Sequence, residues 1–254
     1  METITISNQK GGVGKSTVAV HLAMYLAEKG SRVLFVELDP QGNACKTLSF
    51  HNCVSIVPAS SFFFDSPLNE MEEVEPGQIL AIGADEAMAD IERADPSVLR
   101  VFKENIEAVD EGFDYCVMDT PPTLGLRMTA ALIVSDYVLS PIELEEYSID
   151  GITKMLRTIF GVKEKFNPKL KFLGMVPNRF NARSLSQKET MGELIKNHSS
   201  LLIKSKISLR VSIPEALSEG LPVWALKKTA AREAAKEMIE VFDMVIEKMG
   251  NANG

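Results

Sequence analysis

The chain has 254 residues, of which 45% are apolar and 24% are charged, and its formal net charge is −8. This length is enough for one large α/β domain with a full core, and the composition is typical of a soluble globular protein. No stretch approaches the roughly 18 apolar residues that a membrane-spanning helix needs. The start of the chain also lacks the pattern of a signal peptide. Three cysteines without metal-ligand or disulfide spacing indicate a reducing cytoplasm.

Charge is distributed unevenly along the chain. Residues 154–210 hold thirteen Lys and Arg against three acids, a local net charge of +10, so the rest of the chain carries −18. Residues 65–119 hold sixteen acids against three cations. Two interpretations stay open: a solvated surface of uneven composition, or a molecule with an acidic side and a basic face that binds a polyanion.

The first elements surround a phosphate-binding loop. Residues 3–7 alternate β-branched side chains and predict a strand, and residues 16–29 predict a buried helix ended by Gly30. Between them stands KGGVGKST, whose glycines let backbone N–H groups turn toward one anion. Lys15 can reach the terminal phosphates and the Ser16 hydroxyl can ligate Mg²⁺. The predicted nucleotide-binding residues of this loop are Lys10, Gly11, Gly12, Val13, Gly14, Lys15, Ser16 and Thr17.

Lys10 gives the loop a second lysine, at its front. One phosphate tail does not need two lysines, so Lys10 is expected to serve another tail, held by a partner subunit.

Residues 32–37 predict the next strand, and the loop DPQGN follows it. Asp39 in this loop could orient the water that attacks the γ-phosphate. The glycine and the amide side chains after it favour a loop that changes shape with the bound nucleotide.

Further strands and helices alternate along the rest of the chain. Short apolar runs at 54–57 and 79–82 predict strands, and residues 85–94 and 96–109 predict helices. The strand predicted at 114–119 ends in Asp119, a carboxylate suited to hold Mg²⁺ through water. The later predictions are strands at 137–142 and 171–176, and helices at 148–165, 185–197 and 229–249.

Such alternation predicts the fold class. Strands that alternate with helices form a mostly parallel twisted sheet with helices on both faces, and ligands bind at the carboxyl ends of its strands. No internal repeat, linker or domain boundary interrupts the pattern, so residues 1–254 are expected to form one domain. The terminal helix pairs an apolar stripe with a face on which acids outnumber cations, which favours packing on the sheet over contact with anionic lipid.

These motifs carry a family resemblance. The sequence resembles the ParA/Soj group of the deviant Walker A ATPases, P-loop NTPases whose cousins include MinD. KGGVGKST matches the deviant loop, VELDPQGN resembles the switch segment, and FDYCVMDTPPTLGLRMTAAL resembles the Walker B strand and its following helix. The segment IPEALSEGLPVWAL resembles a late loop before the C-terminal helix. The resemblance covers nearly the whole chain, and the larger ParA proteins' N-terminal helix-turn-helix extension is not expected here.

The resemblance implies a role for each matching residue. Lys10 would touch the phosphates of the partner subunit in an ATP-sandwich homodimer, and Lys15 would be the Walker lysine. Asp39 would be the catalytic aspartate, and Ser16, Asp39 and Asp119 would lie at the magnesium. Two further residues, Asn178 and Pro214, would lie against the adenine. Glu37 stands where the family commonly has an aspartate, and it keeps the charge.

The resemblance also implies partners. The ATP dimer of the family grips nonspecific DNA through basic residues. Arg183 falls where one expected arginine occurs, whereas the second aligns with Ser212, two residues after Arg210. The predicted DNA contacts are Arg183, Lys196, Lys204, Lys206 and Arg210. A ParB-like centromere-binding protein, commonly with a short basic N-terminal segment, would stimulate hydrolysis, and the acidic stretch 65–114 offers that segment a complementary surface.

The resulting hypothesis is a cytoplasmic, nucleoid-associated partition ATPase that uses ATP and Mg²⁺ to segregate a plasmid or chromosome. One alternative keeps the ATPase but changes the cargo to a protein assembly, such as a chemoreceptor cluster or a microcompartment. Another is a metabolic or metal-inserting P-loop enzyme, for which the sequence offers no CxxC or substrate motif. The last is a membrane-surface regulator of the MinD kind, and against it stands the acidic terminal helix.

Overall fold

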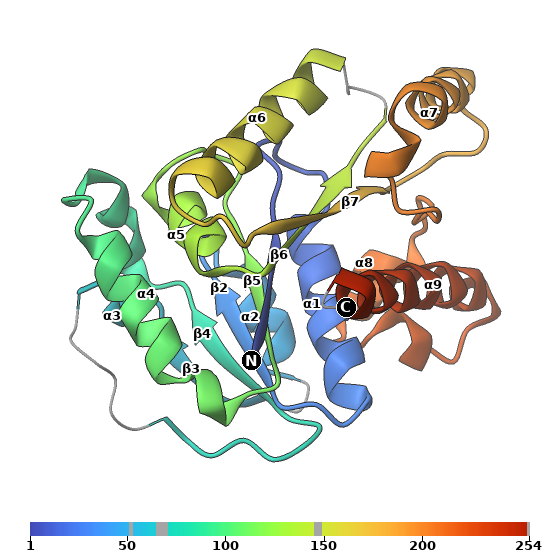
Figure 1. Ribbon diagram of the computed structural model, residues 1–254. Coiled ribbons are helices and arrows are strands. Elements are labelled where there is room, and N and C mark those ends of the chain that lie inside the picture. Colours follow the sequence, from blue (N-terminus) through green and yellow to red (C-terminus); the bar gives the residue numbers. More distant parts are fainter. Residues whose placement is uncertain (51–52, 65–70, 145–148, 253–254) are drawn as a thin grey trace.

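The computed structural model describes residues 1–50, 53–64, 71–144 and 149–252. Its centre is a parallel sheet with helices on both faces (Figure 1). The strands are β1 (Glu2–Ile6), β2 (Val33–Glu37), β3 (Cys53–Pro58), β4 (Ile79–Gly83), β5 (Tyr115–Asp119), β6 (Tyr137–Ile142) and β7 (Lys171–Pro177). Within the described residues these seven strands lie in the order β3-β4-β2-β5-β1-β6-β7. The predicted fold class is therefore confirmed.

The helices of the described part form one layer on each face of the sheet, and one further helix lies beside its edge. They are α1 (Lys15–Glu28), α2 (Asn43–Leu48), α3 (Ser61–Phe64), α4 (Val98–Ala108), α5 (Leu126–Val134), α6 (Ile149–Lys165), α7 (Leu185–His198), α8 (Ser212–Ser218) and α9 (Thr229–Ala252). Buried side chains of α1, α2, α8 and α9 pack on one face of the sheet. Helices α3 to α6 cover the other face, and α7 lies beside the β7 edge (Figure 1).

Local sequence explains why these elements form. Strands β2 and β4 are mostly apolar and every residue in them is buried, as a parallel sheet covered on both faces requires. In α4, Phe102 and Ile106 face the core, while the pairs Arg100–Glu104 and Lys103–Glu107 lie outside. Phe102 stacks on Phe63 of α3 at 4.5 Å between ring centres.

Three segments differ from the sequence-based expectation. Residues 85–94 form two short 3₁₀ helices (Glu86–Ala89 and Ile91–Arg93) instead of a helix, because the segment is too short and too polar to bury one side of a longer one. Residues 213–226, expected as a loop, hold most of α8 and a 3₁₀ turn (Val223–Ala225). Pro214 sits in the first turn of α8, where its missing N–H is harmless. The loop after β2 ends sooner than expected, since α2 begins at Asn43.

The sheet topology positions the functional site. β1 lies inside the sheet, between β5 and β6, and the chain after β1 turns into α1. Ile6 of β1 lies in register with Asp119 of β5, and Glu37 of β2 lies in register with the same aspartate on the other side. The carboxyl ends of three neighbouring strands therefore bring the glycine loop, the DPQGN loop and the β5 aspartate together.

Candidate nucleotide site

The glycine loop has the backbone shape that the sequence predicts. Gly12 and Gly14 have positive φ values of 78° and 88°, a region that favours glycine, and Gly14 is the N-cap residue of α1. The loop thus leads directly into the amino-terminal end of a helix, where free N–H groups and the helix dipole favour an anion. Asn8 holds the loop at its start, since its Oδ1 accepts a hydrogen bond from the Lys10 amide at 3.0 Å.

Lys15 lies inside the loop. Its side chain is buried and its Nζ donates a hydrogen bond to the carbonyl oxygen of Lys10 at 3.1 Å. Burial lowers the pKa of the Lys15 ammonium, and the negative charges of Asp119 and Asp39 offset part of that effect. A cation that is enclosed by the loop and near two carboxylates can shift a short distance to meet a phosphate tail.

Asp119 is completely buried at the end of β5. Burial raises its pKa to about 7, the Ser16 hydroxyl and Lys15 favour the ionised form, and the charges of Glu37 and Asp39 disfavour it. Neither carboxylate oxygen accepts a hydrogen bond of normal geometry from a described residue. A buried carboxylate close to a serine hydroxyl offers the hard oxygen ligands that Mg²⁺ prefers, so these residues fit the predicted ion.

Asp39 lies half-buried in a tight turn after β2. Its Oδ1 accepts a hydrogen bond from the Gln41 amide at 3.1 Å, and its carbonyl oxygen accepts one from the Gly42 amide at 3.2 Å. Gly42 has a φ of 64°, which permits the chain to leave the turn and enter α2. The turn places Asp39 near enough to Lys15 and Asp119 to influence the pKa of both.

A cavity of about 590 Å³ opens beside the glycine loop. Both predicted adenine contacts line it, Asn178 directly after β7 and Pro214 on α8. The Asn178 side chain donates a hydrogen bond from Nδ2 to the Val13 carbonyl oxygen at 2.7 Å. The cavity is continuous with the loop, because Gly12 and Gly14 line it too. It has the position that a base needs when its phosphates occupy the loop.

Two arginines line this cavity that the sequence analysis did not assign to it. Arg179 was not predicted as a site residue, and Arg210 was predicted as a DNA contact. Arg179 has a positive φ of 54°, donates to the Gly12 carbonyl oxygen at 3.2 Å and pairs with Glu143 at 3.4 Å. The sequence signal was weak: an Asn-Arg pair directly after a strand. Arg210 also lines the cavity and pairs with Glu237 on α9 at 3.0 Å.

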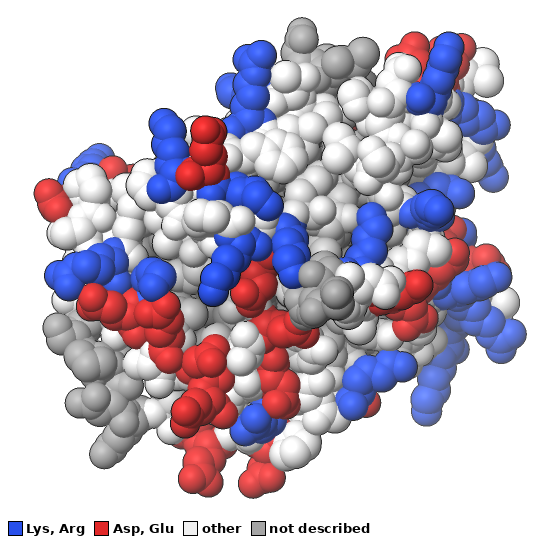
Figure 2. All heavy atoms as spheres, in the orientation of Figure 1, with Lys and Arg blue, Asp and Glu red and all other residues white. Residues whose placement is uncertain are grey.

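The predicted DNA contacts are spread over the edge of the sheet beyond β7. Arg183 precedes α7 and is exposed, as are Lys196 on that helix and Lys204 after it. Lys206 is half-buried, with its Nζ 5.3 Å from the centre of the Phe180 ring. On the face in Figure 2, Lys and Arg gather over the upper and right-hand parts, whereas Asp and Glu dominate the lower left.

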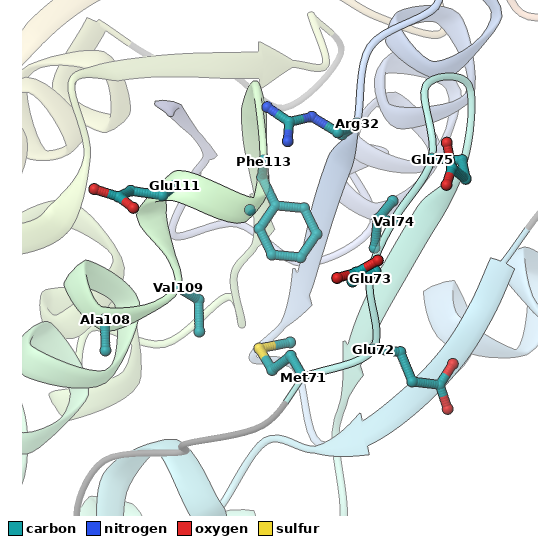
Figure 3. A pocket seen from close by; sticks show the side chains of 11 residues that line it. Arg32, Met71, Glu72, Glu73, Val74, Glu75, Ala108, Val109, Glu111 and Phe113 are labelled. Carbon is teal, nitrogen blue, oxygen red and sulfur yellow. The ribbon is translucent and has the colours of Figure 1, made fainter.

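An acidic groove of about 480 Å³ lies at the opposite end of the sheet, where the strands begin. Figure 3 shows its lining: Met71, Val74, Val109 and Phe113 supply apolar side chains, and Glu72, Glu73, Glu75 and Glu111 supply carboxylates. Arg32 is its single cation within the described residues, and it pairs with Asp114 at 2.9 Å. None of the four glutamates forms an ion pair with a described residue.

Across the described ranges, the helices are too short or too polar to cross a membrane. A family model described as an AAA domain matches residues 1–172. Protein IncC from Escherichia coli is 44% identical over 258 residues, covering 98% of this chain and 70% of that protein. The chromosome-partitioning ATPase Soj from Thermus thermophilus is 34% identical over 220 residues, covering 85% of each.

Solved structures share the fold. An ATP complex of McdA from Cyanothece has a TM-score of 0.82 at 23% identity and covers 98% of this chain and 96% of that one. Cobyrinic acid a,c-diamide synthase from Mycobacterium smegmatis, with an ATP analog and magnesium, has a TM-score of 0.77 at 24% identity, with coverages of 98% and 95%. The extended sequence identity to IncC and Soj goes further than this shared fold: the chain belongs to the ParA/Soj family of P-loop partition ATPases.

Proposed function

We propose that the protein is an ATP-dependent dimerising partition ATPase that binds nonspecific DNA in its ATP state. The observation that carries the proposal is the convergence of Lys15, Asp39 and Asp119 at the end of the glycine loop, with a base-sized cavity alongside. ATP would place its phosphates in the loop and its adenine in the cavity against Asn178 and Pro214. Hydrolysis then gives ADP and phosphate.

Each residue at the phosphates has a separate task. Ser16 and Asp119 would hold Mg²⁺, which neutralises phosphate charge when bound. Lys15 would leave the Lys10 carbonyl oxygen for the terminal phosphates, where a cation stabilises the charge of the transition state. Asp39 would orient the attacking water, because its carboxylate is half-exposed and close to the end of the loop.

The dimer contact would lie at the carboxyl end of the sheet. Leu124, Leu209 and Val211 are 57%, 56% and 84% exposed there. Leu209 and Val211 line the cavity with Gly12, and the segment that carries Leu124 also passes the loop. Exposed apolar side chains around a nucleotide site favour burial against a second copy. Lys10 of each subunit would then neutralise charge on the other nucleotide.

The basic residues beyond β7 would bind DNA. Phosphate contacts need cations and no base-reading code, so Arg183, Lys196, Lys204 and Lys206 suffice for nonspecific binding. Dimerisation doubles the number of cations on one surface, and affinity should therefore rise steeply with ATP. Such binding would place the protein in the cytoplasm on the nucleoid, where a ParB-like partner stimulates hydrolysis.

The acidic groove would bind a basic segment of the partner protein. Its apolar floor and its four unpaired glutamates complement a short peptide with Lys or Arg beside an apolar side chain. Charge reversal of Glu73 and Glu75 to lysine should weaken stimulation by a ParB-like partner. Basal hydrolysis and DNA binding should not change, because the groove lies at the other end of the sheet.

The central experiment compares nonspecific duplex binding and sedimentation with ADP, ATP and a slowly hydrolysed ATP analogue. We expect a dimer and a shifted duplex with ATP or the analogue only. Lys10→Ala should lose both while keeping ATP binding, whereas Lys29→Ala, a remote change at the end of α1, should keep both. A monomer at saturating analogue and Mg²⁺, or equal DNA binding with ADP and ATP, would refute the proposal.

A further inference from the structure

Glu37 is a buried carboxylate that the proposed reaction does not use. It ends β2, is 1% exposed, and lies in register with Asp119. No Lys or Arg in the described ranges forms an ion pair with it. Burying a carboxylate is costly unless it accepts hydrogen bonds, so other donors must stabilise Glu37.

The donors are two backbone amides of α2. Oε1 of Glu37 accepts a hydrogen bond from the Ala44 amide at 2.8 Å, and Oε2 accepts one from the Cys45 amide at 3.0 Å. These amides belong to the first turn of α2, whose N-cap residue is Gly42 and has no side chain to cap them. A carboxylate from the neighbouring strand thus takes the place of the cap.

This arrangement fixes both ends of the loop that carries Asp39. At the start, the Leu38 amide donates to the Asp119 carbonyl oxygen at 2.9 Å and the Leu38 side chain is buried. At the end, the Glu37 carboxylate holds the first turn of α2. The segment between, residues 39–42, is a single tight turn with little freedom of its own.

We infer that Glu37 is a positioning residue: by anchoring the first turn of α2 it holds Asp39 at the nucleotide site. The inference rests on the proposed ATPase function. The longer side chain of glutamate reaches two amides at once, which gives a physical reason for glutamate at this position. Without the anchor, α2 and the turn before it would separate from the sheet part of the time.

Cys45 offers a direct report on α2. Its thiol is buried against β4, with Sγ 3.9 Å from the Ile82 carbonyl oxygen. A Cβ built at Gly83 would lie only 3.3 Å from that sulfur, so the contact is close. Burial also raises the pKa of the Cys45 thiol, which suppresses its reactivity. The thiol becomes reactive only when α2 leaves the sheet.

The experiment measures maleimide labelling of Cys45 in the full chain with Cys53→Ser, alongside amide exchange at Ala44 and Cys45. Cys116, fully buried in β5, serves as the unreactive internal standard. Glu37→Ala should raise both rates about ten- to hundredfold, as expected from losing hydrogen bonds to a charged acceptor. Glu37→Gln keeps one acceptor oxygen and should give a smaller rise. Unchanged rates in both variants would overturn the inference.

Steady-state hydrolysis supplies the second readout. Glu37→Ala should lower kcat by at least about tenfold, and Glu37→Gln should lower it less, with little change in KM for ATP, because Asp39 is displaced while the glycine loop stays intact. Asp136→Ala is the control, since it removes a carboxylate that accepts the Thr3 amide at 2.9 Å at the opposite end of the sheet. It should leave kcat and Cys45 labelling unchanged. Wild-type kcat in Glu37→Ala would also overturn the inference, whereas an inactive wild-type protein would refute only the proposed function.

Discussion

Gly14→Ala tests the contact between the glycine loop and the base cavity. A Cβ at this position would lie 2.1 Å from Nδ2 of Asn178, and the Gly14 φ of +88° is unfavourable for alanine. The backbone strain amounts to about 1–2 kcal/mol. Asn178 must also move and lose its 2.7 Å hydrogen bond to the Val13 carbonyl oxygen, which contributes about 0.5–1.5 kcal/mol. We therefore expect Gly14→Ala to lower the free energy of unfolding by about 2–3 kcal/mol.

A double-mutant cycle separates the two contributions. Urea unfolding, followed by the fluorescence of Trp224, would measure Gly14→Ala, Asn178→Ala and the double variant. Once Asn178 is truncated, only the strain remains, so the cycle should give a coupling energy of about 1 kcal/mol. Gly12→Ala is the matched control: its φ is 78° and no atom lies within 4 Å of the added Cβ. Additive effects of the two substitutions would refute the reasoning.

Three further predictions follow from single side chains. Burial lowers the pKa of His21 to about 4, so the unfolded chain binds the proton at a higher pH than the folded protein does. The free energy of unfolding should therefore fall by up to about 3 kcal/mol as the pH drops from 6.5 to 4. The urea midpoint of His21→Gln should lack this contribution. Phe63→Ala should destabilise by about 3–5 kcal/mol in the same assay, whereas Phe64→Ala should be nearly neutral because Phe64 is 48% exposed. Lys204→Ala should lower the slope of log affinity against log salt concentration by about one, the value for one phosphate contact, in anisotropy titrations with DNA. Arg210→Ala should change this slope less, because Arg210 is already paired with Glu237. An equal change in both variants would contradict this reasoning.

The fold was predictable from the sequence because its strands are short, strongly apolar and regularly spaced. The runs at 32–37 and 114–119 are typical of buried strands, and the alternation with helices implied a parallel sheet. The errors have local causes. Helix α8 was missed because the segment IPEALSEGLPVWAL was assigned as a loop from the family resemblance, and the 3₁₀ helices at 86–93 are too short to show a period.

The site was predictable only where it is continuous in sequence. The shape of residues 10–17 follows from their glycines, and Asp39 and Asp119 each end an apolar strand. The contacts of Glu37 and Arg179 depend on which strands become neighbours and on register, which the sequence pattern leaves open. The roles of Asn178 and Pro214 came from the family resemblance alone, and both residues do line the cavity beside the loop.

The position of β1 between two later strands has a consequence for synthesis of the protein. Glu2 pairs with Tyr115, and Ile4 pairs with Tyr137, so β1 has neither neighbour until β5 has been synthesised, when nearly half of residues 1–254 exist. At about 5–20 residues per second, the nascent β1 waits on the order of ten seconds for its first partner. During that interval the KGGVGKST loop has no scaffold and offers ATP no binding site. Nucleotide can therefore assist only late steps of folding, and chaperones that protect an unpaired apolar strand should matter most before residue 119 emerges.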